Sequence, residues 1–192
     1  DPGIKMIEEK CGIPVVGVIP YMNVDVDDED SLSDRLENKE TKGLIDIAVI
    51  RLPKISNFTD FNSLETIDGF SVRYVSRKGE LKEPDMVIVP GSKSTIADLK
   101  WLRQSGIEGE IKRLAHKGTL IWGICGGYQM LGQKISDPLK TETGGEIEGM
   151  GLLKGKTVFA EEKTRTRIEG KILADGEFSA LNGVYIEGYE IH

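Results

Sequence analysis

The sequence predicts an α/β fold in which a mostly parallel sheet is flanked by helices. Short, continuous apolar runs such as Met86–Val89 and Leu120–Ile124 are typical of strands buried on both faces of a sheet. Between these runs, apolar residues recur every three or four positions, which is typical of helices that cover a sheet. The resulting order of strand, helix, helix, strand and helix indicates right-handed crossovers between parallel strands.

The expected elements follow one another along the chain. A charged helix is expected at Ile4–Lys10, and strands are expected at Val15–Ile19, Ile45–Leu52, Phe70–Ser76 and Met86–Val89. One helix is indicated by Ile96, Leu99 and Leu102, and a second, beyond Gly106, by Ile107, Ile111 and Leu114. The strand Leu120–Ile124 leads into a helix at Gly126–Gly132, and later strands are expected near Lys156–Phe159, Arg167–Ile172 and Val184–Tyr189.

The bulk composition excludes several classes of function. The 192 residues are 39% hydrophobic and 30% charged, which is ordinary for a soluble globular protein. A net charge of −7 without a basic cluster disfavours a nucleic-acid or anionic-membrane partner. No apolar run approaches the ~20 residues that a membrane span needs. The only cysteines, Cys11 and Cys125, favour free thiols in a cytoplasmic protein and predict neither a disulfide nor a metal site.

Residues 25–30 hold five carboxylates in six positions. Such a density of like charge repels itself and packs poorly, so residues 25–43 are interpreted as an acidic linker. A calcium loop would need a glycine turn and a distal glutamate, and this stretch has neither. Because the sequence begins with Asp1-Pro2 and stops after an apolar stretch at His192, we expect it to be part of a longer polypeptide.

The chemically informative segment surrounds Cys125. Gly123, Cys125 and Gly127 form a Gly-x-nucleophile-x-Gly pattern between a strand and a helix, which is the pattern of a nucleophile elbow. The helix N-terminus stabilises a thiolate, and the Gly126 N–H would point toward an oxyanion. A buried structural cysteine is the plain alternative, but three glycines around one residue are hard to explain by packing. Cys11, in an ordinary charged segment, is interpreted as non-catalytic.

The turn Pro90–Thr95 also follows a strand and opens a helix. It resembles a phosphate-binding loop, but Ser92 and Val87 stand where that loop needs glycines. We therefore expect Gly91 or Ser92 to supply a second backbone donor opposite Cys125, since both turns lie at the carboxyl ends of strands. An ordinary turn with a capping serine is the alternative interpretation.

A cysteine hydrolase normally needs a histidine base within hydrogen-bond reach of the sulfur. His116 lies before the strand Leu120–Ile124, and five strand residues at ~3.3 Å each place it roughly 16 Å from Cys125. His192 is the remaining histidine. Either His192 is the base, or the base lies beyond this sequence.

Three segments together resemble one family. VIVPGSKSTIADLKWLRQSG at 87–106, GICGGYQMLG at 123–132 and GYEIH at 188–192 resemble the cobyric acid synthases, glutamine-dependent amide-forming ligases of the cobalamin pathway. GIPVVGVIPY at 12–21 looks like the end of their ATP-binding domain, and EDSL at 29–32 is similar to their linker. The Gly-Ser-Lys block favours this family over the cobyrinic acid a,c-diamide synthases, which tend to carry Pro-Gly-Gly-Tyr there.

The resemblance implies a domain organisation. Residues 1–24 would be the remnant of a dethiobiotin-synthetase-like ATP-binding domain. Residues 44–192 would be a class I glutamine amidotransferase domain with a flavodoxin-like sheet, truncated before its catalytic histidine block. No cofactor is expected within this sequence, whereas ATP and magnesium would bind the preceding synthetase domain, together with the corrinoid substrate.

The resemblance also implies the roles of individual residues. Cys125 would attack the side-chain amide of glutamine, with an oxyanion hole built from the backbone of Gly91, Ser92 and Gly126. Gln129 would hold the substrate glutamine, and Tyr189, Glu190 and His192 would contact its amino-acid end. The family's base lies in a later Leu-His-Gly block, so His192 aligns with the substrate loop, and we expect residues 1–192 alone to be inactive or weak.

Two other classes of protein remain open. A cysteine hydrolase or chaperone of the DJ-1 type shares this elbow, although such proteins usually keep a histidine where Gly126 stands. A non-catalytic amidotransferase-like binding module is the other possibility, favoured by the missing base and disfavoured by the complete elbow and Gln129.

Overall fold

The computed structural model describes residues 2–18, 43–161 and 165–191, and the chain forms two compact units, Asp1–Ser31 and Leu32–His192. In the first unit, helix α1 (Pro2–Cys11) has no buried residue. Gly12, at φ 67°, ends the helix, and its N–H donates to the Glu8 carbonyl at 2.9 Å.

The strand expected at Val15–Ile19 is wrong for residues 15–18, which form no strand, while Ile19 lies outside the described residues. A strand exists only when it pairs with a neighbour, and apolar β-branched residues cannot supply that neighbour themselves. Val16 is 99% exposed, so this stretch has neither strand pairing nor burial.

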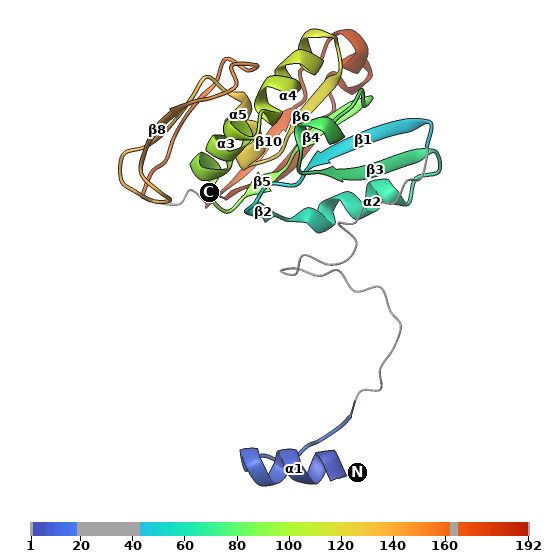
Figure 1. The fold of residues 1–192 in the computed structure, drawn as a ribbon, viewed down its shortest axis with the longest axis vertical. Coiled ribbons are helices and arrows are strands. Elements are labelled where there is room, and N and C mark those ends of the chain that lie inside the picture. Colours follow the sequence, from blue (N-terminus) through green and yellow to red (C-terminus); the bar gives the residue numbers. More distant parts are fainter. Residues whose placement is uncertain (1, 19–42, 162–164, 192) are drawn as a thin grey trace. The chain divides into compact units, whose positions relative to one another are not determined.

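The second unit is built on a parallel four-stranded sheet with the order β3-β1-β4-β6 (Figure 1). Its strands are β1 (Ile45–Ile50), β3 (Phe70–Val75), β4 (Met86–Val89) and β6 (Leu120–Gly123). The second strand lies on one side of the first and the later strands on the other, which is the flavodoxin-like order. The predicted α/β fold with a mostly parallel sheet is confirmed.

Burial separates the inner strands from the edge of this sheet. Val87, Ile88 and Val89 of β4 are buried, as predicted. The prediction that Leu120–Ile124 is a buried strand is wrong, because Leu120 is 41% and Trp122 55% exposed. Among the described strands, β6 pairs only with β4 and so lies at the edge of the sheet. Its apolar residues are therefore explained by their preference for strands and not by burial.

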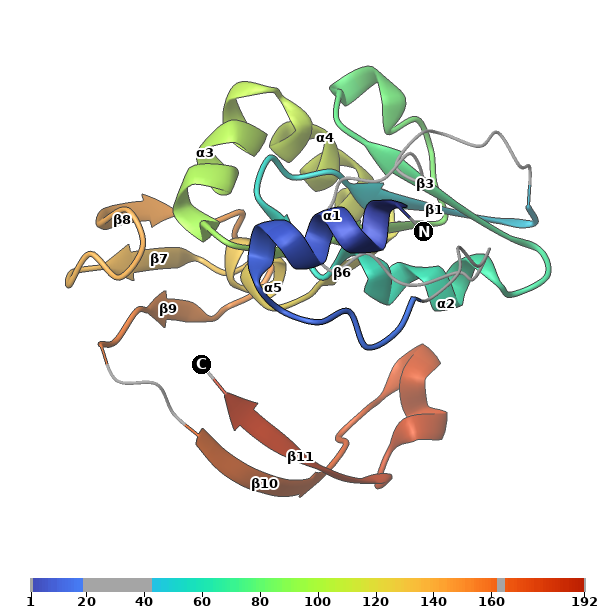
Figure 2. The ribbon, with the colours of Figure 1, turned by 90° about the horizontal axis from the view of Figure 1, so that it is seen from below.

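The helices of this unit are α2 (Asn62–Glu65), α3 (Thr95–Gln104), α4 (Ile107–His116) and α5 (Gly126–Leu131). Helices α3 and α4 lie on one side of the sheet and α2 on the other (Figure 2). The apolar residues that predicted α3 and α4 are buried: Ile96, Leu99, Leu102, Ile107, Ile111 and Leu114. Short 3₁₀ helices occur at Phe58–Phe61, Lys78–Glu80 and Gly176–Leu181.

Three smaller sheets complete the unit. β7 (Lys134–Asp137) pairs with β8 (Gly145–Glu148) and β9 (Lys156–Val158), and β10 (Arg165–Lys171) pairs antiparallel with β11 (Tyr185–Ile191). The three later strands expected from the sequence are therefore present, whereas β7 and β8 were not predicted. The two-residue strands β2 (Ile55–Ser56) and β5 (Gly91–Ser92) pair with each other.

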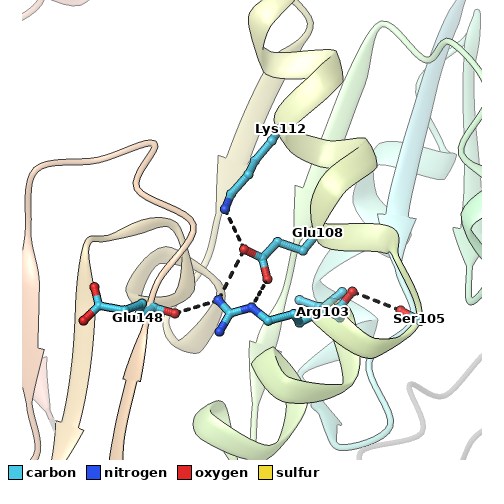
Figure 3. Close-up of polar contacts among 6 residues, drawn as sticks. Arg103, Ser105, Glu108, Lys112 and Glu148 are labelled. Carbon is cyan, nitrogen blue, oxygen red and sulfur yellow. Dashed lines mark hydrogen bonds and ion pairs between the residues drawn. The ribbon is translucent and has the colours of Figure 1, made fainter.

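An ion cluster around the buried carboxylate of Glu108 connects helices α3 and α4 with strand β8 (Figure 3). Glu108 lies between Arg103, at 2.7 Å, and Lys112, at 2.6 Å. Arg103 also donates to the Glu148 carbonyl of β8 at 2.7 Å. Burial alone would raise the pKa of Glu108, but the hydrogen bonds from Arg103 and Lys112 outweigh it and lower that pKa.

Candidate active site

The turns that follow β1, β4 and β6 meet at the carboxyl edge of the parallel sheet. β1 pairs with β4, and β4 pairs with β6, so the three strands are neighbours and end on the same side. The first two turns are joined directly, because Ile55 pairs with Ser92 and Ser56 with Gly91. Ligands of open α/β sheets bind at this edge, so it is the candidate site.

Cys125 occupies the junction between β6 and α5 in an unusual backbone conformation. Its φ of 49° and ψ of −112° fall outside the regions that residues with a side chain normally adopt. Such a conformation costs on the order of 1–3 kcal/mol and persists only where the surroundings enforce it. Hydrogen bonds enforce it on both sides: Ile124 N–H donates to the Val89 carbonyl at 3.0 Å, and Gln129 N–H to the Cys125 carbonyl at 3.1 Å. The cysteine is nevertheless exposed.

The glycines around Cys125 are required by close backbone contacts. A Cβ at Gly127 would lie 1.9 Å from the Val89 carbonyl oxygen, and one at Gly123 would lie 2.7 Å from Tyr128 N. Helix α5 therefore begins directly against the end of β4, which forces the chain to reverse at Cys125. The Gly-x-Cys-x-Gly pattern follows from this close approach of helix and strand.

The structure brings Gly91, Ser92 and Gly126 next to Cys125. A Cβ at Gly91 would lie 3.9 Å from Cys125 Cβ, and one at Gly126 would lie 3.2 Å from Ser92 N. Gly91 and Gly126 are buried, and Ser92 is half-buried. Backbone atoms of two different turns thus lie close to the cysteine side chain and to the residue that follows it.

A buried carboxylate supports the turn that carries Gly91 and Ser92. Asp98, in the first turn of α3, is 1% exposed. Its Oδ2 accepts from the Ser92 hydroxyl at 2.7 Å and from Lys54 N–H at 3.2 Å. Burial raises the pKa of Asp98, and the bonds from Ser92 and Lys54 only partly oppose this effect.

A second carboxylate reaches the same region from the loop between β7 and β8. Glu142 Oε1 accepts from the Thr95 hydroxyl at 3.1 Å, and Thr95 Oγ1 would lie 3.1 Å from a Cβ at Gly126. Asp137 shapes this loop by accepting from the Thr141 hydroxyl and from the amides of Thr141, Glu142 and Gly144. Its burial would raise its pKa, but these four hydrogen bonds lower it to about 2.

The other residues singled out from the sequence lie in three places. Gln129 is half-buried, one helical turn after Cys125. Tyr189, 74% exposed, and Glu190 lie on β11, where they pair with Arg167 and Thr166 of β10. His192 lies outside the described residues. His116 ends α4, before β6 begins, and its Nδ1 lies 2.8 Å from the Lys112 carbonyl.

The sequence interpretation did not single out Asp98, Thr95 or Glu142. For Asp98 a signal existed, because it is a charged residue among the buried positions of α3, directly after a turn rich in hydroxyl groups. For Glu142 no comparable signal existed, because only the loop conformation brings it to Thr95. Among the described residues, no group of three or more His, Cys, Asp or Glu could hold a metal ion, and no helix is long and apolar enough to cross a membrane.

The strand order and the covering helices define the class as an α/β domain with a parallel, flavodoxin-like sheet. A solved structure described as a glutamine amidotransferase shares the fold, with a TM-score of 0.53 and 22% identity, covering 76% of this chain and 70% of that one. The particular family follows from the sequence match: the chain belongs to the CobB/CobQ-like glutamine amidotransferase domain family, which residues 46–192 match.

Curated relatives support this assignment over the full length of the chain. A cobyric acid synthase of Ruminiclostridium cellulolyticum is 57% identical over 192 residues, which are 100% of this chain and 37% of that protein. A cobyric acid synthase of Lachnoclostridium phytofermentans is 52% identical over 197 residues, covering 100% of this chain and 38% of that protein. The chain thus spans somewhat over a third of the length of these relatives.

Proposed function

We propose that the chain is the ammonia-supplying domain of a cobyric acid synthase and that Cys125 is its nucleophile. The observation that carries this proposal is the strained backbone of Cys125, enforced by the contact of Gly127 with the end of β4. A strained, exposed cysteine beside backbone donors is suited to attack on a carbonyl carbon.

The proposed reaction proceeds in two steps. The Cys125 thiolate attacks the side-chain amide carbon of glutamine, and the resulting oxyanion accepts hydrogen bonds from the backbone of Gly126 and of Gly91 or Ser92. The proton that left the Cys125 thiol passes to the amide nitrogen, the C–N bond breaks, and ammonia leaves a γ-glutamyl thioester behind. Water then attacks the thioester, releases glutamate and restores the thiol. Gln129 holds the substrate, and Tyr189, Glu190 and His192 contact its amino-acid end.

In the whole protein, the ammonia would be used by an ATP-dependent synthetase domain, with magnesium, to amidate corrinoid carboxylates. This part of the proposal is supported by the cobyric acid synthases, which are far longer than the chain and match all of it. The chain covers 37% and 38% of the length of these two relatives, so the remaining length can hold a synthetase domain as the partner.

The proposal is tested by labelling with a glutamine-mimicking diazo-ketone, followed by peptide mass spectrometry. We expect one label, on Cys125, that free glutamine suppresses and that Cys125→Ser abolishes. Cys11→Ser is the matched control, because Cys11 is also an exposed free thiol but ends α1, and it should leave labelling unchanged. Labelling that survives Cys125→Ser would refute the proposal.

We further propose that residues 1–192 alone hydrolyse glutamine weakly or not at all. The nucleophile needs a base, and the histidine inside the described residues, His116, precedes β6 whereas Cys125 follows it. Ammonia release by the purified chain should therefore stay near the Cys125→Ser background. Robust turnover by the chain would contradict this expectation.

A further inference from the structure

The carboxylate of Asp98 joins three segments behind the candidate oxyanion hole. Asp98 belongs to α3, Ser92 to the turn after β4, and Lys54 to the turn after β1. Both of these turns donate to the same oxygen, Oδ2. A buried carboxylate is costly unless it is hydrogen-bonded, so at 1% exposure Asp98 favours the one arrangement in which both donors reach it.

The two bonds of the Ser92 hydroxyl fix its direction. The hydroxyl donates to Asp98 at 2.7 Å and accepts from Ser94 N–H at 2.9 Å. The single hydroxyl proton is used in the bond to Asp98, so the hydroxyl cannot at the same time donate a hydrogen bond to the substrate. The backbone nitrogen of Ser92 lies close to the elbow, 3.2 Å from the position that a Cβ on Gly126 would occupy.

The turn is also held at its backbone. Lys93 N–H donates to the Lys54 carbonyl at 2.8 Å, and Gly91 and Ser92 pair with Ser56 and Ile55. Asp98 thus completes a frame that fixes Gly91 and Ser92 relative to the elbow. Oxyanion donors act only within a narrow range of distance, and a misplacement of about 1 Å costs on the order of a hundredfold in rate.

We propose that Asp98 is a positioning residue for the oxyanion hole, acting through Ser92 to hold the backbone of the Gly91–Ser92 turn against the elbow at Cys125. The inference rests on the proposed function, in which Cys125 attacks the glutamine amide. It adds a residue that does not itself contact the reacting atoms, and it assigns the Ser92 hydroxyl to the support of the turn rather than to the substrate.

The test compares two reagents on the whole chain. The diazo-ketone presents a carbonyl oxygen where the glutamine amide oxygen would lie, whereas iodoacetamide alkylates the sulfur without needing the oxyanion hole. Asp98→Ala and Ser92→Ala should each slow diazo-ketone labelling of Cys125 roughly ten- to a hundredfold, with the iodoacetamide rate unchanged. Asp98→Asn, which keeps an oxygen that can accept both hydrogen bonds, should restore most of the rate.

Ser94→Ala is the matched control in the same turn. The Ser94 hydroxyl is buried without a hydrogen-bond partner among the described residues, so its removal should leave both rates unchanged. If Asp98→Ala does not fold, Ser92→Ala decides the test alone. Wild-type labelling by the diazo-ketone in Ser92→Ala, or equal slowing of both reagents, would overturn the inference while leaving the proposed function intact. Labelling that survives Cys125→Ser would instead refute the proposed function.

Discussion

The backbone of Cys125 depends on a glycine two residues later. Gly127 lies so close to the end of β4 that an added Cβ would overlap the Val89 carbonyl oxygen, at 1.9 Å, and approach the Pro90 carbonyl oxygen, at 2.6 Å. Both contacts are with backbone atoms at the end of a buried strand, and these atoms cannot move without disturbing the sheet. The strain at Cys125 is therefore maintained by packing at Gly127.

Gly127→Ala should destabilise the protein and disable the elbow together. We expect a loss of about 2–3 kcal/mol or more in the free energy of unfolding, measured by urea titration, because the overlap forces α5 away from β4. Labelling of Cys125 by the diazo-ketone should be lost in any fraction that remains folded.

Gly109→Ala is the matched control for this substitution. Gly109 is an exposed residue of α4, and a Cβ there would meet nothing within 4 Å. The control should raise the free energy of unfolding by about 0.5–1 kcal/mol, as expected for Gly to Ala in a helix. An unfolding midpoint of Gly127→Ala equal to that of the wild type would show that the elbow is not under this constraint.

At the scale of elements, the cluster around Glu108 connects α3, α4 and β8, and its contribution to stability can be measured directly. Glu108 is 5% exposed, and Arg103 joins it to the β8 backbone at Glu148 (Figure 3). Arg103→Met keeps the aliphatic stem but removes the hydrogen bonds to Glu108 and to the Glu148 carbonyl, leaving the buried carboxylate with Lys112 alone. The free energy of unfolding should fall by about 1–3 kcal/mol, measured by urea titration at neutral pH.

The pH dependence of this effect has a definite sign. The pKa of Glu108 is lowered in the folded protein, so the stabilisation is complete above the ordinary glutamate value of 4.5 and is lost as the pH falls through the folded value. The difference between wild type and Arg103→Met should therefore shrink in acid.

Lys117→Met is the control, because the pair that Lys117 makes with Glu83 is exposed on both sides and should contribute little. An effect of Lys117→Met as large as that of Arg103→Met would contradict the assignment to the cluster around Glu108.

The elements differ in how far the sequence could specify them. β4 was predictable because its continuous apolar run is buried on both faces by α/β packing. Residues 15–18 have a similar composition and form no strand, because pairing depends on a neighbour that local sequence does not encode. β7 and β8 were not predicted, since their alternation is short and their pairing is fixed by the Asp137-centred loop between them.

The candidate site shows the same division. The elbow at Cys125 could be recognised because steric limits demand glycines at fixed positions, and those limits act within a few residues. Asp98 carried a signal as a charge among the buried positions of α3, but neither it nor Glu142 could be connected to the site from local steric limits. Their connections to Ser92 and Thr95 depend on how α3 and the loop after β7 pack, which only the assembled fold determines.

At the scale of the whole molecule, the apolar core lies within one stretch of the chain. Among the described residues, the buried hydrophobic side chains run from Ile47 to Met150, and helix α1 contributes none. Folding stability follows buried apolar area, so it should be concentrated in this stretch. This distribution is compatible with the division of residues 1–24, 25–43 and 44–192 expected from the sequence, which stays a prediction.

Removal of residues 1–42 should therefore leave the stability of the remaining chain unchanged. The shortened protein keeps Gly43, whose Cβ position lies 2.5 Å from the Gly69 carbonyl oxygen, so the entry into β1 is preserved. We expect the urea midpoint and the slope of the unfolding transition to match those of the full chain, because the slope scales with the area exposed on unfolding. Removal of residues 1–50 is the contrasting variant: it deletes β1, which pairs with both β3 and β4, and should abolish cooperative unfolding. A lower midpoint or slope after removal of residues 1–42 would mean that the N-terminal residues contribute buried area to the amidotransferase domain and that the expected boundary is wrong.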